Sequence, residues 1–467
     1  MSEEVAVSGL GARRRIRPRP PSIVIGCLVI ALVVLGGSCV TSATGRASVT
    51  ATAAVPTASS VTSTPPGTPA TPPSPLTAPA TPSASTPPSR ASTYLALSGA
   101  SFADATHGWI IGQRCGRPGT PTPSSTPPCA GLVEATGDGG RTWSAQSLGD
   151  PRLIPVAVQA ADAEDAWIAA TTVDVCGAGP CATVLYSTAN GGRTWNAAYH
   201  TGPSTASIMV NGRPVMARSV ALTSLALVPG HGLWAFGTAC AGLVDTSCRP
   251  VAVASPDGRG FSQVALPTLP PALHATLAHP TASDAWIAAG ADVPGAGRIV
   301  ASHDGGKTWQ TLPDPAPTDP WQALTFRSAT EGWLLSGSVP GAGQQIKTLY
   351  HTTNGGRTWQ RVAGGPFNAT PIPGTALPTS GYVGPLVFPT PTTGWIASPR
   401  GGLLHSSDGG RTWARVRGVT CGDLTCQSVG FASPTVGWVV SNGGLWLTTD
   451  GGAVWRQARV PGEVPVQ

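Results

Sequence analysis

Charged side chains are scarce in this sequence, at 11% of 467 residues, and only 22 residues are Asp or Glu. Seven of the 28 Lys and Arg and two of the Asp and Glu precede Tyr94, so the rest of the chain carries a formal charge of only +1. That balance excludes the net basic field with which proteins attract nucleic acid. The sequence also lacks a nucleotide-binding loop, a Ser-His-Asp arrangement and zinc-type Cys/His spacing, so we expect no cofactor and no metal.

Glycine (59), proline (48) and tryptophan (15) are abundant instead, and they follow a pattern. An eight-residue box, S/T-x-D/N-G-G-x-T-W, recurs with 42 to 66 residues between successive closing aromatics. The copies are residues 136–143, 188–195, 302–309, 352–359, 406–413 and 448–455, with a degenerate copy at 255–262. Self-similarity at this period indicates a repeat architecture.

Each box reads as a turn between two strands. Its Asp or Asn side chain can accept hydrogen bonds from backbone N–H groups of the turn, and Gly-Gly supplies positive φ at little steric cost. The closing Trp is expected to fill apolar space between neighbouring sheets. We therefore assign these residues a structural role: Asp138, Trp143, Asn190, Trp195, Asp257, Asp304, Trp309, Asn354, Trp359, Asp408, Trp413, Asp450 and Trp455.

A second motif, typified by Phe102 to Trp109 (FADATHGW), alternates with the box and recurs as FRSATEGW, FPTPTTGW and FASPTVGW. It predicts strand, polar turn, strand. One repeat is then four strands: A ends near the Phe, B begins at the Trp, C runs into the box and D leaves it. Seven such units predict an all-β, seven-bladed propeller with four antiparallel strands per blade. The predicted blades span about 94–150, 151–199, 216–267, 272–314, 319–364, 382–417 and 425–461.

The two motifs together resemble the Asp-box (BNR) repeat propellers, and in particular the photosystem II stability/assembly factor-like family. The resemblance runs from about Tyr94 to Val460. It implies a non-enzymatic scaffold that docks onto a membrane complex. Because the same box occurs in sialidases, xyloglucanases and sortilin-type receptors, the box by itself does not specify a function.

The first 93 residues predict a membrane attachment. Residues 1–21 form a basic tail, and the uncharged run 22–40 is long enough to cross a bilayer with the arginines inside, which places the propeller outside. The alternative is a lipoprotein, with Cys27 or Cys39 as the modified residue. Residues 41–93, rich in Thr, Ser, Pro and Ala, predict a disordered stalk. We expect a monomeric head held at the cell membrane.

Eight cysteines lie in the predicted propeller, in four close pairs. An even number in an extracytoplasmic domain predicts disulfides rather than a metal site. The expected bonds are Cys115–Cys129, Cys176–Cys181, Cys240–Cys248 and Cys421–Cys426. In an up-and-down blade, the B–C and D–A connections emerge on one side, called here the loop face, while A–B turns and boxes form the box face. The four pairs, and the long D–A loops 196–216 and 361–381, are predicted on the loop face.

Variable, stapled loops on a rigid scaffold are where binding usually occurs. Residues entering the innermost strands on that side are expected to ring the mouth of the central channel, beside Trp321, which belongs to neither motif. The candidate binding residues are Thr223, His274, Trp321, Gln322 and Gln427. The alternative is that these polar residues only solvate a water-filled channel.

The function predicted from the sequence is therefore a non-enzymatic binding or assembly scaffold for a protein or glycan. The alternative is a sialidase-like exo-glycosidase, which needs an arginine cluster, a Tyr nucleophile with a Glu partner, and an acid. Glu134 and Glu331 lie near turns that are predicted on the wrong face, and the F/Y-R-I-P signature of sialidases is absent after Tyr94.

Overall fold

The computed structural model describes residues 93–116, 129–172, 182–201, 207–210, 213–216, 219–240, 248–270, 275–279, 281–290, 297–365, 370, 372–421, 426–441 and 444–461. They all belong to one compact unit, Ser85–Gln467. The predicted basic tail, membrane-crossing run and stalk lie outside the described residues, except for Thr93. Within the described part, no helix has the length and apolar character needed to cross a membrane.

Seven four-stranded antiparallel sheets form the unit, and in each sheet the strands follow one another in chain order. The first three are β1 (Thr93–Phe102), β2 (Gly108–Gly116), β3 (Cys129–Thr136) and β4 (Ser144–Gln146); β5 (Leu153–Ala160), β6 (Asp165–Thr172), β7 (Thr183–Ala189) and β8 (Asn196–His200); and β11 (Ser219–Val228), β12 (Gly232–Cys240), β13 (Cys248–Ser255) and β14 (Ser262–Gln263).

The other four sheets complete the set. They are β15 (Ala275–Ala278), β16 (Ala285–Ala289), β17 (Arg298–Ser302) and β18 (Gln310–Leu312); β19 (Trp321–Phe326), β20 (Gly332–Gly337), β21 (Lys347–Thr352) and β22 (Gln360–Gly364); β23 (Leu386–Val387), β24 (Gly394–Ser398), β25 (Gly402–Ser406) and β26 (Ala414–Arg415); and β27 (Cys426–Phe431), β28 (Gly437–Ser441), β29 (Gly444–Thr448) and β30 (Arg456–Ala458).

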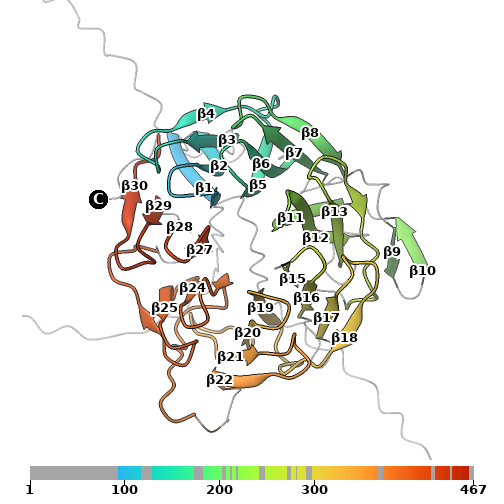
Figure 1. Ribbon diagram of the computed structural model, residues 1–467, viewed down its shortest axis with the longest axis vertical. Helices are drawn as coiled ribbons and strands as arrows, with labels where there is room; N and C mark the ends of the chain where they lie inside the picture. The colour runs from blue at the N-terminus through green and yellow to red at the C-terminus, as the bar shows by residue number, and fades with distance from the viewer. Residues whose placement is uncertain are drawn as a thin grey trace, which may run out of the picture. The chain divides into compact units, whose positions relative to one another are not determined.

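The sheets stand around a ring, with strand A of each sheet toward the centre and strand D at the rim (Figure 1). The predicted seven-bladed propeller with four antiparallel strands per blade is confirmed. Buried clusters lie between successive blades, for example Trp286 with Leu324 and Tyr350, and Trp333 with Leu404. Every strand B carries a Trp at or near its start, and its indole fills apolar space between sheets.

The ring closes without strand exchange, since blade 1 comes entirely from the N-terminal end of the unit and blade 7 from its C-terminal end. Phe102 and Ile110 of blade 1 share a buried cluster with Trp438, Ala458 and Val460 near the end of the chain. We call this contact the seam. It repeats the contact between other neighbours, because Phe102 packs on Trp438 with ring centroids 5.7 Å apart.

Two connections differ from the prediction. The loop expected over 196–216 contains a separate hairpin, β9 (Ser207–Val210) with β10 (Arg213–Met216), which pairs with no blade strand. The other, 361–381, does not stay on the loop face. At Ala376 it runs parallel to the box of blade 6, where the Ala376 N–H donates to the Arg411 carbonyl and the Trp413 N–H donates to the Ala376 carbonyl. The segment around Ala376 therefore lies against the box of blade 6, on its way from blade 5 to blade 6.

Candidate functional site

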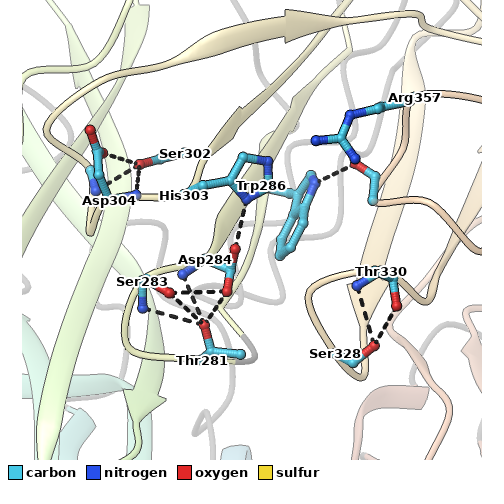
Figure 2. A network of polar contacts seen from close by, with 12 residues as sticks. Thr281, Ser283, Asp284, Trp286, Ser302, His303, Asp304, Ser328, Thr330 and Arg357 are labelled. Carbon is cyan, nitrogen blue, oxygen red and sulfur yellow. Dashed lines mark hydrogen bonds and ion pairs between the residues drawn. The ribbon is translucent and has the colours of Figure 1, made fainter.

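The box turns use their own polar groups. In blade 4, the Ser302 hydroxyl donates to Asp304 Oδ1 at 2.8 Å (Figure 2). The same hydroxyl accepts from the Gly306 N–H, and the Thr308 N–H donates to Asp304 Oδ1 at 2.9 Å. The Thr308 hydroxyl donates to the other carboxylate oxygen. These Thr308 bonds lower the pKa of Asp304 to about 2. A carboxylate that is ionised and accepts hydrogen bonds on both oxygens can stabilise a turn, but it has no proton to donate as a general acid.

The first glycine of each box joins the box to the A–B turn of its own blade. Its N–H donates to a turn carbonyl at 2.8–2.9 Å in six blades. The pairs, donor first, are Gly139 with Thr106, Gly191 with Glu164, Gly305 with Ser283, Gly355 with Thr330, Gly409 with Thr392, and Gly451 with Thr435. This bond explains why the two motifs alternate, and it places A–B turns and boxes together on the box face.

The carbonyl of the same glycine joins one blade to the next. The Trp286 indole N–H of blade 4 donates to the Gly355 carbonyl of blade 5 at 3.0 Å (Figure 2), and Trp333 donates likewise to Gly409. Trp167 donates to Gly258 at 2.7 Å. Each of these glycine peptides is thus an inter-blade joint.

Two other side chains take the role of the indole. Gln146 on strand D of blade 1 donates to the Gly191 carbonyl at 2.8 Å, and Arg456 on strand D of blade 7 donates to the Gly139 carbonyl at 2.6 Å. The second bond spans the seam. The sequence pattern does not reveal either residue, because Gln146 and Arg456 belong to no repeated position.

The opposite face carries the covalent staples. Cys115–Cys129 links the end of β2 to the start of β3, and Cys240–Cys248 links β12 to β13, so both close B–C connections. Cys421–Cys426 closes the D–A connection before β27. These three predicted disulfides are confirmed. The fourth pair, Cys176 and Cys181, lies outside the described residues.

The predicted channel-mouth residues differ in their exposure. Thr223 is exposed, and Trp321 is half-buried at the start of β19. Gln322 is only 3% exposed, and its amide nitrogen donates to the Asp314 carboxylate and the Ala316 carbonyl, so it stabilises the D–A connection before β19 instead of facing solvent. Gln427 is half-buried, and His274 lies outside the described residues.

Thr223 and Gln427 nevertheless share a backbone feature. The pairing register of strands A and B shifts between Leu222 and Ser224, and again between Cys426 and Ser428. Each residue therefore sits in a β-bulge, and Ser98 occupies the equivalent bulge of β1. Bulges re-aim side chains at the ends of strands. The sequence contains no signal for them.

A group on the loop side of blades 5 and 6 was missed by the sequence reasoning. Ala342 and Arg400, in the B–C turns of these blades, have φ of 49° and 62°, which non-glycine residues seldom adopt. The Arg400 guanidinium lies 5.8 Å from the centre of the Tyr382 ring, a cation–π contact. Val339, in the same turn as Ala342, is 78% exposed. Backbone strain of this kind concentrates at functional sites.

Lys347 underlies this group. It is 2% exposed, and its ammonium donates to the carbonyls of Gln345, Thr379, Ser380 and Gly381 at 2.9–3.2 Å. It thereby fastens the end of the 361–381 connection to strand C of blade 5. Burial lowers the pKa of Lys347 to about 8. A lone Lys in a strand gives no sign of this role in the sequence.

Stability should therefore depend on pH through Lys347. Because its pKa is lower in the folded chain than in the unfolded chain, the unfolded chain binds more protons between about pH 8 and 10. The free energy of unfolding should rise with pH there, by up to about 1.4 kcal/mol per pH unit. Urea unfolding of Lys347→Met should lack this rise, and Lys307→Met, at an exposed box position, should keep it. Equal slopes in both variants would contradict the assignment.

The acids considered for a glycosidase have structural partners. Glu134 is 3% exposed on β3, where burial raises its pKa and Arg114 lies 3.7 Å away. Glu331 pairs with Arg327 at 2.8 Å in the A–B turn of blade 5. Glu331 lies in a turn and Glu134 lies near the end of β3, just before the box, so both positions agree with the prediction.

Comparisons with known proteins are consistent with the repeat. No family model matches the chain. A 62-residue stretch, 13% of the chain, is 42% identical to the photosystem II assembly lipoprotein Ycf48 of Synechocystis sp. (strain PCC 6803). The chain is similar to Ycf48. The match confirms the resemblance to the photosystem II assembly factors, and it spans 18% of the length of that Ycf48.

Solved structures of Ycf48 proteins are also similar. Ycf48 bound to a D1 peptide is 16% identical with a TM-score of 0.45, over 77% of this chain and 92% of that one. Ycf48 from Cyanidioschyzon merolae is 15% identical with a TM-score of 0.46, over 78% and 97%. A Hadza microbial sialidase is 14% identical with a TM-score of 0.39, over 70% and 66%.

Proposed function

We propose that this chain is a non-enzymatic assembly scaffold, anchored in the membrane outside the cytoplasm, that binds a protein partner through its loop face. The observation that carries the proposal is that the polar groups of the box face are bonded within the propeller, whereas the loop face presents closed and strained connections to solvent. On the box face, polar groups of the turns are used within and between blades. On the loop face, disulfide-closed connections and the strained turns at Ala342 and Arg400 remain available.

The charge distribution favours an acidic segment of the partner. Within the described part of residues 321–461, all three carboxylates (Glu331, Asp408 and Asp450) lie in box-face turns. Arg400 lies in the B–C turn of blade 6, and the Arg415 guanidinium lies beside Gly402 at the end of that turn. Arginine guanidinium groups suit bidentate binding of carboxylates. The name of the matched Synechocystis protein, an assembly lipoprotein, supports assembly and membrane attachment.

Photo-cross-linking at two exposed valines tests the proposal. Val339 (78% exposed) lies on the loop face and Val454 (65% exposed) in the box of blade 7, so they form a matched pair. A benzophenone amino acid at position 339 of the full chain should form a protein adduct in membranes, and one at 454 should not. Arg400→Glu should remove the adduct at 339. An adduct from 454 alone, or from neither position, would contradict the proposal.

Hydrolysis assays separate the glycosidase alternative. The purified full chain should not turn over sialosides or other aryl glycosides. Turnover that is lost on substitution of loop-face Arg or Glu residues would favour an enzyme. A glycan partner in place of a protein would appear as lectin-like retention on a glycan array without a protein adduct at position 339.

A further inference from the structure

The joint between blades 2 and 3 carries an imidazole between two carboxylates. Asp162 lies in the A–B turn of blade 2 and Asp165 begins β6 directly after that turn, while His231 lies in the A–B turn of blade 3. His231 Nδ1 lies 3.3 Å from Asp165 Oδ2, and Nε2 lies 3.9 Å from Asp162 Oδ2. One ligand atom from each residue can be chosen so that all three lie within 4.8 Å of one another. The set is the sole such group of three or more His, Cys, Asp or Glu within the described residues.

The geometry points to a divalent transition-metal site at this joint, with Zn²⁺ as the best-fitting ion. Zn²⁺ binds imidazole nitrogen at about 2.0–2.1 Å and carboxylate oxygen at about 2.0–2.2 Å, and ligands of a tetrahedral ion are then about 3.4 Å apart. An imidazole binds one ion through a single nitrogen, and His231 Nδ1, at 3.3 Å from Asp165 Oδ2, is already close to that spacing. One ligand atom from each of the three residues lies within 4.8 Å of the others. Imidazole in the set favours zinc-like ions over Mg²⁺ and Ca²⁺, which prefer oxygen ligands. Two carboxylates neutralise the ion, and an open position remains for water.

The side chains are free to close around an ion. Asp162 uses Oδ1 to accept from the N–H groups of Glu164 and Asp165, which leaves Oδ2 directed to His231. The side chains of His231, Asp162 and Asp165 are 49%, 47% and 28% exposed, so an ion can enter from solvent. Small rotations of exposed side chains suffice to shorten the longest separation.

This joint is one of three, with those before blades 2 and 4, at which strand A of the following blade has no Phe at or just after its end. Strand A of blade 3 ends at Val228, where blades 1, 5, 6 and 7 have Phe102, Phe326, Phe388 and Phe431 at or just after the end of the strand. Trp286 and Trp333 stack on two of those rings at 3.9 Å. Blade 3 also has the degenerate box. A metal ion held by these side chains would add a link between blades 2 and 3, where Tyr199 contacts Phe261 with ring centroids 5.9 Å apart.

Calorimetric titration of the untagged full chain, stripped with EDTA and desalted, tests the site with Zn²⁺ alone. We expect one equivalent to bind, and Mg²⁺ to bind at least about tenfold more weakly. His231→Ala and Asp162→Asn should each weaken Zn²⁺ binding by about tenfold or more. His107→Ala is the matched control, because His107 is also an exposed turn residue but faces one carboxylate, Asp104. It should bind Zn²⁺ as the wild type does.

The melting temperature, measured with and without Zn²⁺, distinguishes loss of the site from misfolding of a variant. Zn²⁺ should raise the melting temperature of the wild type and of His107→Ala, since a ligand that binds only the folded state stabilises it. It should leave His231→Ala unchanged, although that variant should melt cooperatively. Absence of binding by the wild type, or equal binding by wild type and His231→Ala, would overturn the site and leave an ordinary ion pair. Neither result bears on partner binding at the loop face.

Discussion

Replacing Trp333 with alanine is expected to lower the free energy of unfolding by about 4 kcal/mol. Trp333 is fully buried and stacks on Phe388 of the next blade at 3.9 Å with the rings 5° from parallel. Its indole N–H also donates to the Gly409 carbonyl at 3.3 Å. The substitution therefore removes a large apolar contact and an inter-blade hydrogen bond together.

Denaturant unfolding followed by tryptophan fluorescence measures this loss. Trp333→Phe keeps an aromatic ring but lacks the N–H, so it should lose less than half as much. Trp321→Ala is a control outside both repeat series, at a half-buried position, and should lose less than Trp333→Ala. A loss below about 1 kcal/mol for Trp333→Ala would show that the indoles do not hold the blades together.

Phe102→Ala at the seam is expected to lower the free energy of unfolding by about 3 kcal/mol or more. Phe102 is 3% exposed and contacts Trp438 of blade 7 as well as Trp143 of its own box. The seam is the one blade junction that no peptide connection spans. Loss of the Phe should therefore open the ring locally, and amide exchange should accelerate in β1, β28 and β29.

Phe326→Ala is the matched variant, because Phe326 stacks on Trp286 at 3.9 Å within a junction that the chain connects. It should cost a similar amount of stability and leave exchange at the seam unchanged. If Phe102→Ala leaves exchange in blades 1 and 7 unaltered, the ring does not close through this contact.

The sequence predicted the ring because every blade needs the same turns and the same contacts between sheets, so the same residues recur. Each Asp or Asn, Gly-Gly and Trp recurs at a fixed offset, and each offset corresponds to a turn or an inter-sheet contact that every blade needs. Asp304 and Trp413 occupy positions that follow from the pattern alone. Close spacing within single loops likewise predicted the Cys115–Cys129 and Cys240–Cys248 bonds.

What the sequence did not predict is pairing between residues far apart in the chain. Arg456 meets Gly139 across 317 residues, and the Lys347 ammonium meets Gly381 across 34. Neither residue type specifies such a partner. Gln322 was expected at the channel mouth because it enters an innermost strand, yet its buried amide donates to the Asp314 carboxylate eight residues earlier, a contact that the repeat pattern does not show. The contact between His231 and Asp165 could not be predicted for the same reason, because it forms only when blades 2 and 3 lie side by side.

The most direct test concerns the first glycine of the boxes, whose N–H joins the box to the A–B turn of its own blade and whose carbonyl, at Gly139, Gly191, Gly355 and Gly409, also accepts from the neighbouring blade. Hydrogen exchange of Gly139, Gly191, Gly305, Gly355, Gly409 and Gly451 amides can be measured by NMR on the intact chain. These turn amides should exchange as slowly as strand amides, because their hydrogen bonds break only when a blade opens. Exchange at the rates of an unstructured peptide would contradict this prediction.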